Sequence, residues 1–107
     1  MAWIVLVLSG LLEAGWAISL KLSHGLTRLG PSVAFAVFGV VSFAGLTWAL
    51  RALPAGTAYA VWTGIGAALT AVIGMAWLGE SASALRIVSV ALIVAGVVGL
   101  NLAGTAH

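Results

Sequence analysis

The 107-residue sequence contains no cysteine, and this absence excludes disulfide bonds and thiolate metal sites. Charge is scarce as well, because only 6% of the residues are charged, whereas a soluble globular domain carries roughly 25%. The formal net charge is +2, and the four basic residues are spread along the chain, which predicts no patch for nucleic acid. With 64% hydrophobic residues, the composition indicates a membrane protein in contact with lipid.

The side chains that usually carry hydrolytic or metal chemistry are also missing. The two histidines, His24 and His107, lie far apart in the sequence and lack the spacing of metal ligands. No Ser/His/Asp or Cys/His arrangement is present, and no glycine-rich phosphate loop follows a strand pattern. We therefore expect no metal site, no cofactor and no enzymatic activity.

Four long apolar runs predict an all-α membrane protein with transmembrane helices over about 3–22, 31–50, 57–78 and 85–103. A bilayer core about 30 Å thick needs about 20 residues of helix, and the runs lack the alternation of barrel strands. The connections are short, so we expect one four-helix domain over 1–107. We also expect Thr57 to cap the third helix and Ser81 or Ser83 the fourth. The first run lacks a preceding basic segment, which favours a retained span over a cleaved signal.

Glu13 lies midway along the first predicted helix, at membrane depth. A carboxylate there costs a few kcal/mol and persists only where it meets a cavity, a partner or a ligand. Four thin helices do not easily enclose a polar cavity. The sequence therefore predicts an oligomer in which Glu13 from more than one subunit faces a shared chamber.

Polar and aromatic side chains at the same depth predict a cation site around Glu13. Residues three or four apart share a helix face. This spacing groups Gly10 and Trp16 with Glu13 on the first helix, groups Tyr59, Trp62, Thr63 and Gly66 on the third, and leaves Ser42 near the middle of the second. The acid attracts a cation and the aromatic rings offer their faces. The alternatives are that Ser42 bonds its own preceding turn and that the aromatic residues face lipid or the membrane interface.

Two groups of small residues have predicted roles in helix movement or packing. Gly64 and Gly66 allow either a kink in the third helix or close packing against a neighbouring helix. On the fourth helix, residues at three- and four-residue spacing lie along one side, and this side is the predicted dimer interface: Ser89, Leu92, Gly96 and Gly99.

The charge bias between the two membrane sides is small. Lys21, Arg28 and Arg86 fall on one side of the predicted topology and Arg51 on the other. So small a difference orients a chain only weakly, and two opposite insertions of the same chain are possible.

Several motifs carry a resemblance that covers essentially the whole chain. They are Gly10-x-x-Glu13, the loop Lys21-x-Ser-His-Gly25-Leu-Thr-Arg28-Leu, and the run Leu53-Pro54-Ala-Gly56-Thr-Ala-Tyr59-Ala-Val-Trp62-Thr-Gly64-Ile-Gly66. Together they resemble the small multidrug resistance family. Trp16, Ser42 and the run Leu78-Gly-Glu-Ser-Ala82 are similar to its guanidinium-exporter branch, whereas Gly15 and Asn101 depart from that branch.

The resemblance implies an antiparallel homodimer in the bacterial inner membrane that exchanges protons for guanidinium and small guanidinylated cations. It implies that Glu13 is the shared proton and substrate site, that Trp16, Ser42, Tyr59 and Trp62 line it, and that Gly10 is the small residue beside it. It also implies that Gly64 and Gly66 form the kink of the third helix. We expect the donors of Ser42 and Trp16 to fix the angle of the carboxylate, which favours a flat, forked cation.

Three other functions remain open at this stage. The nearest is a multidrug exporter of quaternary ammonium and aromatic cations with the same fold and the same Glu13. A small uncoupled pore and a non-transporting assembly subunit belong to other classes. Saturable cation binding and proton movement distinguish an exchanger from both.

Overall fold

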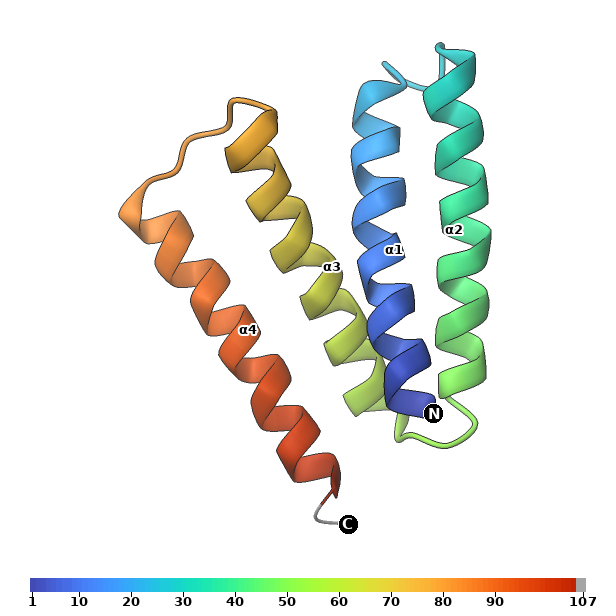
Figure 1. The fold of residues 1–107 in the computed structure, drawn as a ribbon, viewed down its shortest axis with the longest axis vertical. Helices are drawn as coiled ribbons and strands as arrows, with labels where there is room; N and C mark the ends of the chain where they lie inside the picture. Colours follow the sequence, from blue (N-terminus) through green and yellow to red (C-terminus); the bar gives the residue numbers. More distant parts are fainter. Residues whose placement is uncertain (106–107) are drawn as a thin grey trace.

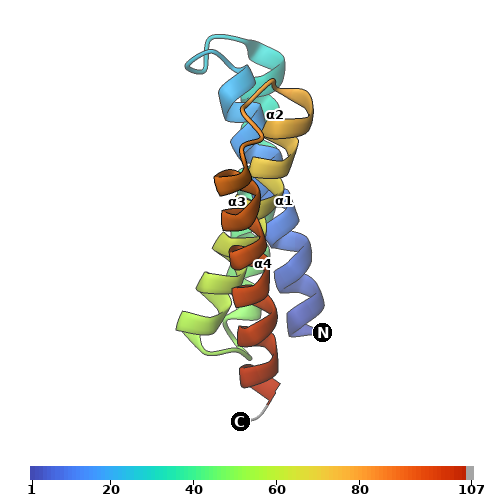
Figure 2. The same cartoon turned by 90° about the vertical axis from the view of Figure 1, so that its left-hand side faces the viewer.

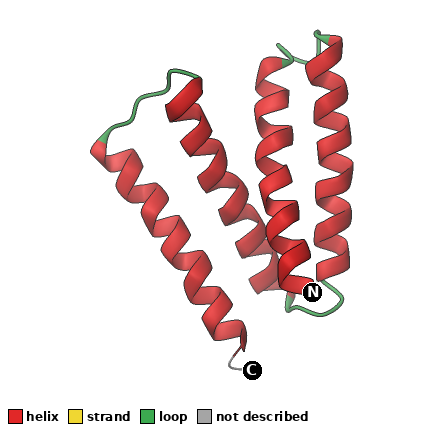
Figure 3. Cartoon of the chain, viewed as in Figure 1, coloured by secondary structure: helices red, strands yellow, loops and turns green. Residues whose placement is uncertain are grey.

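The computed structural model describes residues 1–105, so His107 lies outside the described part of the chain. Helix α1 spans Ala2–Leu22, α2 spans Leu29–Ala49, α3 spans Ala55–Trp77 and α4 spans Ala84–Thr105 (Figure 1). Each end lies within two residues of its predicted position. The described residues contain helices and loops but no strand (Figure 3). All four helices are long and apolar enough to cross a membrane, as the sequence predicts.

The helix ends follow local hydrogen bonds and turns. The Ser23 hydroxyl donates to the Leu20 carbonyl at 2.6 Å and closes α1. Helix α3 begins at Ala55, directly after Pro54, and no side chain caps it, so the predicted cap at Thr57 is wrong. Pro54 is the cap residue, with φ −58° and ψ 141°, and its carbonyl accepts the Ala58 amide at 2.9 Å, so the helix begins at Ala55, two residues before the predicted start. Ser83 accepts a hydrogen bond from the Arg86 amide at 3.3 Å, so the cap of α4 is the predicted Ser83.

The helices form a flat layer rather than a closed bundle. Helix α1 packs against both α2 and α3, whereas α4 contacts α3 and no other helix within residues 1–105. The extents of the molecule are 45 × 34 × 17 Å, and the short dimension is visible when the layer is seen edge-on (Figure 2). No residue of 84–103 is buried, so α4 offers most of its surface to the surroundings.

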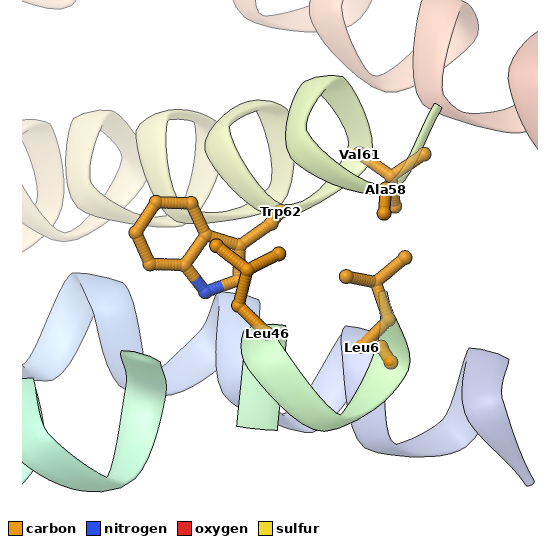
Figure 4. Packing of buried hydrophobic residues seen from close by; sticks show 6 residues of the cluster. Leu6, Leu46, Ala58, Val61 and Trp62 are labelled. Atoms are coloured by element: carbon orange, nitrogen blue, oxygen red, sulfur yellow. The ribbon is translucent and has the colours of Figure 1, made fainter. Parts of the chain in front are cut away.

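The buried apolar cluster lies where α1, α2 and α3 meet, toward the N-terminal end of α1. In Figure 4, Leu6 faces Ala58 and Val61, while the indole of Trp62 lies beside Leu46. These side chains are buried, whereas many other large apolar residues of the chain are exposed. Exposed apolar side chains on helices of this length are suited to lipid or to a second copy of the chain.

Candidate functional site

Glu13 lies on the side of α1 that faces α3, directly against Gly66. A Cβ atom built on Gly66 would lie 2.7 Å from Glu13 Cγ and closer still to the carboxylate, so any other residue at position 66 would displace the carboxylate from this position. The Oε1 atom of Glu13 is buried and has no hydrogen-bond partner among the described residues. A buried carboxylate oxygen is normally bonded, so this atom is the natural position for a proton or a cation.

Two further buried polar atoms have no hydrogen-bond partner in the part of the chain that the structure describes. They are Nε1 of Trp16 and Oγ1 of Thr63. Trp16 follows Glu13 by three residues and Thr63 precedes Gly66 by three, so each shares a helix face with one side of the Glu13–Gly66 contact. The spacing of Thr63 predicts its place on this face of α3, but Thr63 was not among the predicted site residues.

A chain of hydrogen bonds joins α3, α2 and α1 beside Glu13. The indole Nε1–H of Trp62 donates to Ser42 Oγ at 3.2 Å, and the Ser42 hydroxyl donates to the Ser9 carbonyl at 2.7 Å. Trp62 is 3% exposed and Ser42 is fully buried. The bond to Ser9 crosses between helices, so the alternative that Ser42 bonds its own preceding turn is wrong.

The expected direct support of the Glu13 carboxylate by Ser42 is also wrong, because the single Ser42 proton is directed to the Ser9 carbonyl. Ser9 was not among the residues predicted for the site. The available signal was its position four residues before Glu13, which places both on one face of α1.

A row of aromatic rings connects the predicted site residues. Ring centroids of Tyr59 and Trp62 lie 5.9 Å apart, those of Trp62 and Phe43 5.1 Å, and those of Phe43 and Trp16 6.4 Å. Phe35 extends the row with an edge contact to Trp16 at 6.0 Å. Neither Phe43 nor Phe35 was among the predicted site residues. The row offers a succession of electron-rich faces, which attract cations.

Gly10 is buried against α3 rather than open beside the carboxylate. A Cβ atom there would lie 3.1 Å from Ile65 Cβ and 3.3 Å from the Trp62 carbonyl oxygen. Its place in the structure is a close approach of α1 and α3, which sets how near Glu13 comes to Gly66. A contact of Gly10 with substrate stays a prediction.

The glycines of α3 also lie at close contacts. Helix α3 is continuous over Ala55–Trp77, and a Cβ atom on Gly64 would lie 2.8 Å from Val97 Cγ2 of α4. Close packing therefore accounts for Gly64 as it does for Gly66, and a kink at either stays a prediction. The residues predicted for the dimer interface are all exposed on α4, and that interface also stays a prediction: Ser89, Leu92, Gly96 and Gly99.

The comparison with known proteins agrees with this geometry. Residues 1–93 match the family described as Small Multidrug Resistance protein. The chain belongs to the small multidrug resistance family. It is a multi-pass membrane protein and a transporter rather than an enzyme, as the sequence predicts.

Relatives with high identity carry a more specific name. The chain is 59% identical over 102 residues to a protein of Citrobacter freundii named "Guanidinium exporter", covering 95% of this chain and 97% of the relative. Proteins with the same name match from Yersinia pestis, with 59% identity over 103 residues, and from Escherichia coli strain K12, with 56% over 102 residues. These alignments cover 96% and 95% of this chain and 99% and 97% of the two relatives.

Proposed function

We propose that the protein is a proton-coupled antiporter that exports guanidinium and small guanidinylated cations across the bacterial inner membrane. The observation that carries this proposal is the buried, unpartnered Oε1 atom of Glu13, midway along a helix that is long enough to span a bilayer. The names of relatives at 56–59% identity support guanidinium as the substrate.

The chemistry of the site suits exchange of a proton for a flat cation. Guanidinium is planar and presents its N–H donors in a fork that matches the two oxygens of a carboxylate. A proton on Glu13 occupies the same oxygens, so proton and cation compete. A bare carboxylate is the most costly state of Glu13 at membrane depth. The site therefore turns from one side of the membrane to the other more readily with a proton or a cation bound than when it is empty.

Two chains are needed to enclose the site. The layer is 17 Å thick in its shortest extent, and α4 contacts α3 but no other helix of residues 1–105, so its remaining surface is uncovered. A second copy inserted in the opposite direction brings its own Glu13 to the same chamber. The face of α4 with Ser89, Leu92, Gly96 and Gly99 is the contact that we assign to this antiparallel homodimer.

Proton release tests the exchange directly. Guanidinium is added to the purified, weakly buffered protein in detergent, and the pH of the solution is followed. The expected result is a saturable release of protons by the wild type and none by Glu13→Gln. Glu80→Gln is the matched control, because Glu80 lies in the α3–α4 loop with an ion pair to Arg86 at 3.6 Å. Release that persists in Glu13→Gln refutes the site.

The aromatic row favours one alternative substrate class, quaternary ammonium and aromatic cations, because such cations bind aromatic faces without hydrogen bonds. Competition between guanidinium and tetraphenylphosphonium for the Glu13 site separates the two. We expect guanidinium to bind and tetraphenylphosphonium to compete weakly. Tight binding of tetraphenylphosphonium with weak binding of guanidinium assigns the protein to the alternative class.

A further inference from the structure

A close approach of α1 and α2 lies one helical turn from the Ser42 hydroxyl. A Cβ atom built on Gly45 would lie 2.6 Å from Ser9 Cβ and 3.0 Å from Ser9 Oγ. Ordinary van der Waals contact begins at 3.4 Å. The near atom is the Ser9 Cβ, which is fixed to the backbone, so a change of side-chain rotamer does not relieve the overlap. Any side chain at position 45 therefore pushes the two helices apart by about 1 Å.

Ser9 is held in place by its own helix. Its hydroxyl donates to the Val5 and Leu6 carbonyls at 2.8 and 3.0 Å, which directs the hydroxyl back along α1. The hydroxyl is thus occupied, and the group that Ser9 offers to α2 is its main-chain carbonyl. In an α-helix this carbonyl also accepts the amide N–H four residues later, which belongs to Glu13. The acceptor of Ser42 is thereby part of the peptide ladder that holds Glu13.

We propose that Gly45 and Ser9 are positioning residues that set the cation selectivity of the transporter by holding the Ser42 proton on the Ser9 carbonyl. Gly45 follows Ser42 by three residues and lies on the same face of α2. A separation of about 1 Å at this contact lengthens the 2.7 Å bond from Ser42 beyond hydrogen-bond range. The Ser42 hydroxyl is then free to turn toward another acceptor, and the Trp62 indole that bonds to it loses its fixed partner.

This inference rests on the proposed function, because the selectivity that it concerns is that of cation exchange at Glu13. Its consequence is that the Ser42 proton is withheld from the carboxylate in this state. The Glu13 Oε1 atom then remains unpartnered within the described residues and available to a proton or to a forked cation. If the Ser42 hydroxyl is released, it becomes a donor that competes for the Glu13 carboxylate. This competition lowers the affinity for a cation that binds through its own N–H donors, and it lowers the affinity for a cation without donors less.

Three variants test the inference. Gly45→Ala introduces the overlap, and the pair Gly45→Ala/Ser9→Gly removes it while keeping the Ser9 main-chain carbonyl. Gly39→Ala is the matched control, because it is a glycine of the same helix whose added Cβ would meet nothing within 4 Å. The first measurement is the NMR signal of the Trp62 indole N–H, assigned with Trp62→Phe. The second is the ratio of guanidinium to tetraethylammonium transport in liposomes.

Gly45→Ala is expected to shift the indole signal and to lower the transport ratio severalfold. The double variant is expected to restore both, and Gly39→Ala to change neither. Adding Gly45→Ala to Ser42→Ala is expected to cause no further loss of selectivity, since both act on one hydrogen bond. If Gly45→Ala does not fold, a folded double variant with the wild-type indole signal supports the proposal, and a double variant that remains unfolded or shifted overturns it.

The two proposals fail in distinguishable ways. A wild-type protein that moves no guanidinium refutes the proposed function, whereas the indole signal still reports on the positioning of Ser42. A wild-type protein that exports guanidinium, combined with a Gly45→Ala variant of unchanged indole signal and unchanged transport ratio, overturns the role of Gly45 and Ser9 alone.

Discussion

The side chain of Glu13 lies so close to Gly66 that a Cβ atom at position 66 would come within 2.7 Å of Glu13 Cγ. The carboxylate therefore occupies space that every other residue type at position 66 would take. This contact joins α1 to α3 at the depth where the proposed proton and cation exchange occurs.

Gly66→Ala is expected to displace the carboxylate and weaken cation binding. Overpacking costs roughly 1–3 kcal/mol, which corresponds to a dissociation constant about 5- to 150-fold higher if the displacement acts on binding. Isothermal titration of guanidinium into the purified protein measures it. Gly56→Ala is the control on the same helix, because its added Cβ would meet nothing within 4 Å. Equal affinity of Gly66→Ala and wild type contradicts the contact.

Guanidinium binding is expected to weaken as pH falls. Protons and the cation compete for the Glu13 oxygens, so protonation of the carboxyl removes the binding site. Where Glu13 is mostly protonated, linkage predicts a Kd that rises about tenfold for each pH unit lost, for one displaced proton. Binding measured at several pH values checks the slope. A Kd that does not depend on pH would show that cation and proton occupy different groups.

Trp16→Gly is expected to lower the selectivity for guanidinium over tetraalkylammonium ions. The indole contacts Phe43 and Phe35, and its removal opens space for bulkier cations. Changes of pocket size are worth about 10- to 200-fold in discrimination, and we expect the lower part of that range. The ratio of the two transport rates in liposomes is the measurement. Trp77→Gly is the control, because Trp77 is 78% exposed near the end of α3.

The helices were predictable because their signals are local. Each apolar run is bounded by charged residues, glycine or proline, and each helix end lies within two residues of the predicted one. The error at the start of α3 is local too. Thr57 has the chemistry of a cap, but the Pro54 carbonyl accepts the first helical amide, and the helix starts at Ala55, two residues before the predicted start.

The site was predictable only as far as helix periodicity reaches. A spacing of three and four residues placed Glu13 with Trp16, and Tyr59 with Trp62, on their respective faces. Periodicity does not say which atoms of different helices meet. Ser42 bonds to the carbonyl of Ser9, and no pattern in the chain marks a main-chain acceptor. Phe43 was missed for the same reason, since its ring contacts come from two other helices.

Gly64→Ala is expected to destabilise the protein through the contact of α3 with α4. The new Cβ would lie 2.8 Å from Val97 Cγ2, and valine is stiff at χ1, so the loss is roughly 1–3 kcal/mol of folding stability. Gly64→Ala/Val97→Ala makes room and is expected to regain both thermal stability and transport rate. A double variant that is stable but transports slowly would instead assign Gly64 to the predicted kink.

Gly96→Trp is expected to convert the proposed dimer into monomers. Gly96 lies on the exposed side of α4 with Leu92 and Gly99, and glycines on such a face let membrane helices approach closely. A tryptophan there holds the two helices apart. Sedimentation in detergent, together with chemical cross-linking in membranes, measures the association.

Ala91→Trp is the matched control for the dimer prediction. Ala91 is exposed on α4 as well, but it lies about 100° around the helix from Leu92, away from the predicted interface. We expect this variant to remain dimeric, because the added ring points to lipid beside the predicted dimer interface. Equal dissociation of both variants would point to a different interface. A Gly96→Trp protein that stays dimeric would exclude α4 as the contact, since no dimer packed through that face accommodates the ring.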